Sequence, residues 1–182
     1  MNKNIPYVAF LRGINVGGHA PIKMAALKDA FAEMGFEKVR TLLASGNVLF
    51  ESGQADKRAI AAEIALGLHR LLRKDVGVVV RSRQDLEKIL AADPFKGIVV
   101  TPSTRLYVTF LGEKTGPRTM AVPYAAPRGD FRILRATPTE VFSVLDLSKG
   151  KGTPEAMAII EKEFGANVTT RNWNTVLKAL SS

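Results

Sequence analysis

A glycine-rich segment near the start of the chain holds the residues best suited to bind a ligand. Glycines can adopt positive φ angles and turn backbone N–H groups toward an anion, and a helix N-terminus with a lysine behind the segment adds positive potential. The segment is not a Walker A loop, because no Lys-Ser or Lys-Thr follows its last glycine, and its spacing differs from the dinucleotide Gly-x-Gly-x-x-Gly pattern. It therefore predicts an anion site, with a tight loop as the alternative. The candidate ligand-binding residues are Arg12, Gly13, Asn15, Gly17, Gly18, His19 and Lys23.

A second polar segment, 169–175, surrounds the only tryptophan of the chain. Arg171, Asn172 and Trp173 are its candidate ligand-binding residues. The structural alternative makes Asn172 the N-cap of a helix and lets Trp173 pack on a sheet. Guanidinium groups and loop amides bind anions well only when they converge, so the two segments are expected to line one pocket, with Ser45 and Asn47 as neighbours.

Enzymatic chemistry has less support from the residue types. The only histidines are His19 and His69, and His69 is interpreted as an exposed helix residue without a role. A small hydrolase or transferase would use His19 with Ser45 or Arg12, but no carboxylate near His19 in sequence could orient its ring. The sequence Ser45-Gly46-Asn47 is also a turn signal. Catalytic residues therefore stay unassigned, and neither a metal site nor a cofactor is predicted.

The elements that would position these residues follow a β-α-β-β-α-β order, which is typical of the ferredoxin-like motif. Residues 6–12 alternate as a strand, and apolar residues recur at helical spacing from Ile22 to a stop at Gly35. Short apolar runs flank the Ser45 turn as a hairpin, Asp56 caps a second helix, and 77–80 form the fourth strand. Ser82 then caps a short helix that ends near Leu90.

The chain repeats this order. Tyr7–Leu11 returns as Tyr107–Leu111, and Arg81–Leu90 aligns with Arg171–Leu180 at a shift of 171 − 81 = 90. The sequence therefore predicts an α+β fold of two tandem ferredoxin-like (βαββαβ) halves, an internal duplication in which each half has four strands with helices on one face. The first half covers 1–92, a connector 93–104, and the second half 105–182.

In the second half, a Pro-rich segment replaces the first long helix. The predicted strands and helices are a strand at 105–111, the Pro-rich segment 112–129, strands at 131–135 and 141–145, a helix capped by Thr153 that stops at Gly165, a strand at 167–170, and a last helix opened by Asn172.

The formal net charge is +9, and a basic surface attracts nucleic acid or anionic small molecules. The lysines and arginines are scattered, so an uninvolved basic surface is the alternative. Base stacking of the kind used by RNA-recognition modules is unsupported, because Tyr7 and Phe10 face opposite sides of their strand. No apolar run is long enough for a membrane helix, and the absence of cysteine excludes disulfides. A cytoplasmic protein is expected, and the sequence does not predict its oligomeric state.

Four segments resemble the bacterial "domain of unknown function 1697" family. They are 10–18, Ile22-Lys23-Met24, 45–48 and 170–175. The resemblance implies an α+β fold of two related subdomains and supplies no agreed activity or catalytic residue. The function that the residues favour is binding of an anionic ligand, either a phosphate-bearing small molecule or nucleic acid. The alternatives are the hydrolase or transferase and a structural or protein-interaction module.

Overall fold

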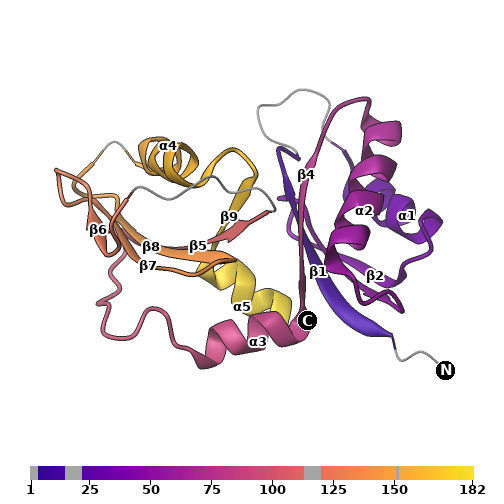
Figure 1. Ribbon diagram of the computed structural model, residues 1–182, viewed down its shortest axis with the longest axis horizontal. Helices are drawn as coiled ribbons and strands as arrows, with labels where there is room; N and C mark the ends of the chain where they lie inside the picture. The colour runs from indigo at the N-terminus through magenta and orange to yellow at the C-terminus, as the bar shows by residue number, and fades with distance from the viewer. Residues whose placement is uncertain (1–3, 15–21, 113–119, 151) are drawn as a thin grey trace. The chain divides into compact units, whose positions relative to one another are not determined.

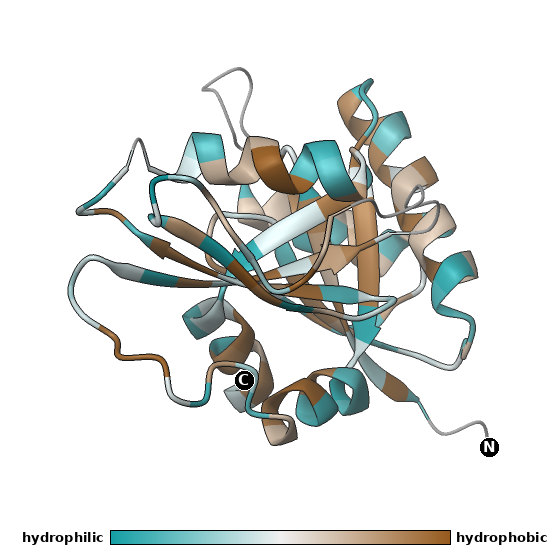
Figure 2. Cartoon of the chain, turned by 60° about the vertical axis from the view of Figure 1, so that its left-hand side comes forward, coloured by the Kyte–Doolittle hydropathy of each residue, from teal (hydrophilic) through white to brown (hydrophobic). Residues whose placement is uncertain are grey.

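The structure is a computed structural model that describes residues 4–14, 22–112, 120–150 and 152–182. The chain divides into two compact units, Met1–Glu87 and Lys88–Ser182 (Figure 1). The described residues form a mixed α/β fold with two antiparallel sheets and five helices. In Figure 2 both the strands and the helices carry hydrophobic and hydrophilic stretches, as expected for elements that each bury one side.

Unit 1 contains a four-stranded sheet. Its strands are β1 (Ile5–Arg12), β2 (Glu37–Leu42), β3 (Asn47–Ser52) and β4 (Gly77–Ser82), in the order β2-β3-β1-β4, and all neighbours are antiparallel. Its helices are α1 (Met24–Glu33) and α2 (Lys57–Leu72), and α3 (Arg83–Ala91) begins directly after β4. The predicted β-α-β-β-α-β order of this half is thus present in the structure.

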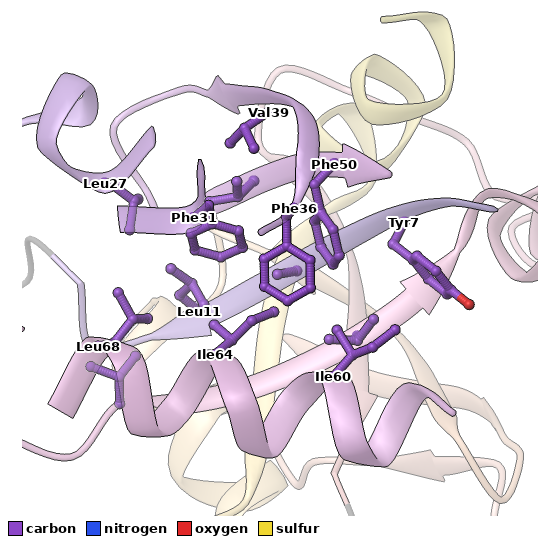
Figure 3. Packing of buried hydrophobic residues seen from close by; sticks show 14 of the residues in the cluster. Tyr7, Leu11, Leu27, Phe31, Phe36, Val39, Phe50, Ile60, Ile64 and Leu68 are labelled. Atoms are coloured by element: carbon purple, nitrogen blue, oxygen red, sulfur yellow. The ribbon is translucent and has the colours of Figure 1, made fainter. Parts of the chain in front are cut away.

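Both α1 and α2 pack on the same face of the unit 1 sheet. Tyr7, Ala9 and Leu11 alternate onto that face of β1, where they join buried side chains from both helices. Three phenylalanine rings fill the centre of this core (Figure 3), with Phe36 and Phe50 separated by 4.7 Å between ring centroids. Burial of these large side chains provides the main stabilisation of unit 1.

Unit 2 contains a five-stranded sheet. Its strands are β5 (Thr104–Leu111), β6 (Tyr124–Ala125), β7 (Phe131–Ala136), β8 (Glu140–Asp146) and β9 (Val168–Asn172), in the order β6-β7-β8-β5-β9. Its helices α4 (Thr153–Phe164) and α5 (Trp173–Ser181) lie on opposite faces of the sheet (Figure 1). Four strands with helices on one face had been predicted for this half, so both details were wrong.

The physical reason for the difference lies in two segments. Residues 120–126 contribute an edge strand that pairs Tyr124 with Ile133, and their side chains pack into the core beneath α4. This segment therefore occupies sequence that holds a helix in the first half. The sheet also presents apolar residues on its other face, including Val108 and Phe110, and α5 packs against β5 and β9.

The predicted caps are correct at three of four helices. The Asp56 carboxylate accepts hydrogen bonds from the backbone N–H of Arg58 and Ala59, and Asn172 caps α5. At α3, the Asp85 N–H donates to the Ser82 hydroxyl at 3.1 Å, and the Ser82 N–H donates to the Asp85 carboxylate at 2.9 Å. This reciprocal pair is a capping box.

Thr153 does not cap α4, so that prediction was wrong. The N-cap is Gly152, with a φ of 87° and no side-chain cap hydrogen bond. Helix α4 begins at Thr153 itself, whose hydroxyl lies 3.2 Å from the Tyr107 hydroxyl. The threonine oxygen is therefore used to connect α4 to β5 rather than to satisfy the first turn of the helix.

Candidate anion-binding site

One end of the unit 1 sheet gathers the segments that the sequence singled out. Register pairs Arg12 with Gly77 and Phe10 with Asn47, so the end of β1 adjoins the starts of β3 and β4. Because the strands are antiparallel, α1 begins and α2 ends at this same end (Figure 1). Arg12 at the end of β1 and Ser45 in the β2–β3 hairpin, 45 − 12 = 33 residues apart, thereby lie at the same end of the sheet.

Arg12 lies opposite a glycine that leaves room for it. A Cβ atom on Gly77 would lie 3.1 Å from the Cβ atom of Arg12, tighter than most such contacts. Gly77 is not a positive-φ residue, so its backbone does not itself require glycine. At the matching place in unit 2 the glycine is on the other segment. Gly112 follows β5, donates its N–H to the Asn167 carbonyl and leaves space for the Asn167 side chain.

The hairpin residues Ser45, Gly46 and Asn47 close onto β1. The Leu11 N–H donates to the Gly46 carbonyl at 2.8 Å, and Gly46 has a φ of +72°. Asn47 is fully buried, and its amide donates to the Leu42 carbonyl and to the Ser45 hydroxyl, each at 3.0 Å. These contacts give the Ser45 hydroxyl a role in shaping the turn.

Among the residues that the structure describes, none caps the N-terminus of α1 with its side chain. Its N-cap is Lys23, which is exposed, and the first turn holds no acidic residue. An ammonium group can only donate hydrogen bonds, so it cannot satisfy the first N–H groups of the helix. These groups keep the positive partial charge of the helix dipole, and Lys23 adds a full charge beside it.

Further cations come from the end of α2, which sequence reasoning did not include. Arg70 is in the last turn of α2, Arg73 is its C-cap with a φ of 54°, and Lys74 follows. The Lys74 Nζ lies 3.4 Å from the carbonyl oxygen of Gly13, so its ammonium reaches the segment after β1. No local pattern could have revealed this, because the approach spans 61 residues and depends on strand order.

We call this region the basic end of unit 1. Its five cations are Arg12, Lys23, Arg70, Arg73 and Lys74. Across the described segments that meet there, 12–14, 22–24, 43–47 and 69–77, the sequence contains one acidic residue, Asp75. The basic end can therefore attract and hold an anion through charge and hydrogen-bond donors.

Asp75 is hydrogen-bonded to the other histidine of the chain. The His69 Nδ1 lies 2.9 Å from the Asp75 carboxylate, and the side chains are 52% and 100% exposed. Such an exposed pair contributes little to stability. The Asp75 carboxylate is therefore a partner of His69, for which the sequence predicts no role. Asn15, Gly17, Gly18 and His19 lie outside the described residues, so their proposed roles stay predictions.

The C-terminal candidates each have a structural contact in unit 2. The Asn172 side chain accepts from the Asn174 N–H at 2.9 Å, and the Trp173 ring lies edge-on to Phe95 at 5.4 Å. Arg171 donates to the Thr169 hydroxyl at 2.8 Å, and burial lowers its pKa to about 10. The expectation that this segment lines a common pocket with the Arg12 segment stays a prediction.

Neither a metal nor a membrane site emerges from the part of the chain that the structure describes. No group of three or more His, Cys, Asp or Glu side chains in that part is arranged to hold an ion. No helix in the same ranges combines the length and apolar character that a bilayer crossing requires.

Comparison with known proteins adds the family and the fold. No match was found among curated proteins. The chain is similar to the solved structure of conserved bacterial protein SP0830 from Streptococcus pneumoniae, with 20% identity, a TM-score of 0.69 and coverage of 98% of each chain. At this identity the likeness shows the fold alone. The family described as protein of unknown function (DUF1697) matches residues 5–142. The chain therefore belongs to the DUF1697 family.

Proposed function

We propose that the protein binds a phosphate-bearing anion at the basic end of unit 1. The observation that carries this proposal is that five cations lie on segments that meet at one end of the sheet, beside the N-terminus of α1, whose N-cap Lys23 makes no side-chain cap hydrogen bond. Phosphate groups are recognised by guanidinium groups, ammonium groups and backbone N–H groups at helix N-termini, and the basic end offers all three.

The rest of unit 1 supports this location by contrast. At the opposite end of the sheet, cations are paired with carboxylates: Lys38 contacts Glu51 at 2.9 Å, and Lys57 contacts Asp85 at 2.7 Å. These pairs neutralise their own charge. The segments at the basic end carry five cations and one acidic residue, Asp75, and this excess of positive charge favours the approach of an anion.

Unit 2 supports the same choice. The end of its sheet that corresponds to the basic end carries the carboxylates of Glu140, Glu161 and Glu163. Gly112 stands in unit 2 where the strand order places Arg12 in unit 1. The arginine at the end of the first strand, and the glycine opposite that leaves space for its side chain, are therefore features of unit 1 that the matching end of unit 2 does not share.

The expected partner is an anionic small molecule or nucleic acid. The segments 12–24, 43–47 and 69–77 contain no Phe, Tyr or Trp, so base stacking has no platform in them. Recognition would rest on phosphate groups. A cytoplasmic location, which the absence of cysteine favours, would give access to such ligands.

A thermal-shift screen with phosphate, sugar phosphates, nucleotides and short oligonucleotides tests the proposal. A ligand that binds only the folded state raises the midpoint of unfolding. The variant Arg12→Ala is expected to weaken the response while leaving the melting temperature of the free protein nearly unchanged. Lys38→Ala, which removes a cation 72% exposed at the opposite end, is the matched control. An equal response from both variants would place the site elsewhere.

We also propose that the two units arose by duplication of one ferredoxin-like unit. Strands β7-β8-β5-β9 follow the same order as β2-β3-β1-β4. The registers correspond as well, since Tyr7 pairs with Ser82 and Tyr107 pairs with Asn172. Helices α3 and α5 begin at a shift of 173 − 83 = 90, the shift of the sequence repeat.

One hydrogen bond of unit 1 recurs at the matching position of unit 2. The Leu11 N–H donates to the hairpin carbonyl of Gly46, and the Leu111 N–H donates to that of Thr139, each at 2.8 Å. An experimental structure tests the duplication: β1, β3 and β4 should superpose on β5, β8 and β9 at these registers. A one-residue offset between the registers would count against it, because side chains would then face the wrong side of the sheet.

A further inference from the structure

Gly77, the first residue of β4, lies against the side chain of Arg12. The two residues are register partners on the paired strands β1 and β4. Beyond the chain neighbours of Gly77, the described atoms nearest to an added Cβ are Cβ, Cδ and Cγ of Arg12, at 3.1, 3.6 and 3.9 Å. Three successive carbons of the arginine therefore pass over the glycine. We infer that Gly77 is a positioning residue that sets the course of the Arg12 side chain and thereby the affinity for phosphate, an inference that rests on the proposed function.

The backbone does not explain the glycine at this position. Gly77 is not a positive-φ residue, so an alanine could adopt its conformation. A glycine in a strand weakens the strand, because it adds conformational freedom to the unfolded chain and packs no side chain. Such a glycine often marks a place that another group approaches closely, and here that group is the Arg12 side chain.

The matching pair of unit 2 also holds one glycine and one side chain. Gly112 and Asn167 occupy it, at the shifts of the two sequence repeats, 112 − 12 = 100 and 167 − 77 = 90. An added Cβ on Gly112 would lie 2.5 Å from the side-chain nitrogen of Asn167. In each unit these two facing positions thus have room for one side chain. In unit 1 that side chain is a cation, because the glycine is on β4 and the arginine on β1.

The course of the Arg12 side chain matters because a guanidinium binds phosphate through N–H groups held in one plane. An arginine that is already held in the free protein loses less conformational freedom on binding, which raises affinity. A second cation lies close by, since the Lys74 ammonium is 3.4 Å from the carbonyl oxygen of Gly13, the residue after Arg12. A methyl group on Gly77 would crowd the carbons of Arg12 first.

A double-mutant cycle, measured by calorimetric titration of the full-length chain with pyrophosphate, tests the inference. Gly77→Ala is expected to weaken binding about fivefold, the scale of holding a side chain away from its preferred rotamer. The same substitution should have no effect in the Arg12→Ala background, whereas the loss should persist in the Lys74→Gln background. Gly112→Ala, which crowds Asn167 at the matching place of unit 2, is the matched control and should leave the affinity unchanged.

A second measurement uses the unaltered protein and does not depend on how well Gly77→Ala folds. Nitrogen-15 relaxation of the arginine Nε–H groups reports how firmly each side chain is held. In the free protein the Nε–H of Arg12 should be more ordered than that of Arg132. Arg132 is an exposed arginine on β7 whose register partners are Ala125 and Val144 rather than a glycine.

The outcomes separate this inference from the proposed function. If Arg12→Ala weakened binding and Gly77→Ala did not, the positioning role would be overturned while anion binding would stand. The same conclusion would follow if Gly77→Ala weakened binding equally in the Arg12→Ala background, or if the Nε–H of Arg12 were as mobile as that of Arg132. Absence of pyrophosphate binding by the unaltered protein would overturn both.

Discussion

Replacing Gly46 with alanine should destabilise unit 1 at the place where the hairpin closes onto β1. Gly46 has a φ of +72°, and an added Cβ would lie 3.1 Å from the Cβ atoms of Ile14 and Leu11 and 3.3 Å from the Leu11 carbonyl oxygen. The left-handed backbone costs a non-glycine residue about 1–2 kcal/mol. Crowding in a packed region adds about 1–3 kcal/mol, so a total loss of roughly 2–5 kcal/mol is expected.

Gly13 provides the matched control, because it has the same φ of +72° and nothing within 4 Å of an added Cβ. Gly13→Ala should therefore lose only the backbone cost of about 1–2 kcal/mol. Urea unfolding of both variants, followed by circular dichroism, gives the two free energies. If Gly46→Ala lost no more stability than Gly13→Ala, the close approach of the hairpin to β1 would be refuted.

Two further predictions concern stability. Burial tends to raise the pKa of Asp85, but hydrogen bonds from Lys57 and Ser82 outweigh burial and lower that pKa. The ionised carboxylate therefore stabilises the fold above about pH 4. This contribution is lost as the pH falls through the folded pKa. Asp85→Asn should cost about 1 kcal/mol at pH 7 in urea unfolding, and a pH-independent loss would contradict the role of the charge. The Ser143 hydroxyl is buried and has no hydrogen-bond partner among the described residues, so Ser143→Ala should raise the free energy of unfolding by about 1 kcal/mol. Thr109→Val, which removes a hydrogen-bonded hydroxyl, should lower it, and a loss of stability in both variants would contradict the interpretation.

The sequence predicted those parts of the fold that depend on local patterns. Periodicity located the strands of unit 1, and short-range capping chemistry located the starts of α2 and α5 at Asp56 and Asn172. The two-residue strand β6 escaped prediction because it carries no alternation long enough to detect. The prediction that Thr153 caps α4 was wrong because threonine is a common N-cap, whereas here its hydroxyl lies near the Tyr107 hydroxyl.

The candidate site was predictable only in part. Arg12 and Lys23 flank a glycine-rich segment that the sequence shows directly, and Ser45 is part of a turn pattern. Lys74 gives no comparable signal, since its approach to Gly13 exists only after β4 pairs with β1. The contribution of Gly77 is equally hidden, because the space it leaves matters only once Arg12 lies opposite.

Chemical-shift mapping of a phosphate titration tests anion binding at the basic end most directly. Backbone amide resonances of the isotopically labelled protein would be followed as pyrophosphate is added at low ionic strength. We expect the shifts to concentrate in the first turn of α1 and in residues 12–14 and 70–77, while the resonances of residues near Lys38 and Glu51 at the opposite end stay unchanged. Shifts centred elsewhere in the chain, or no saturable shift at any amide, would contradict it.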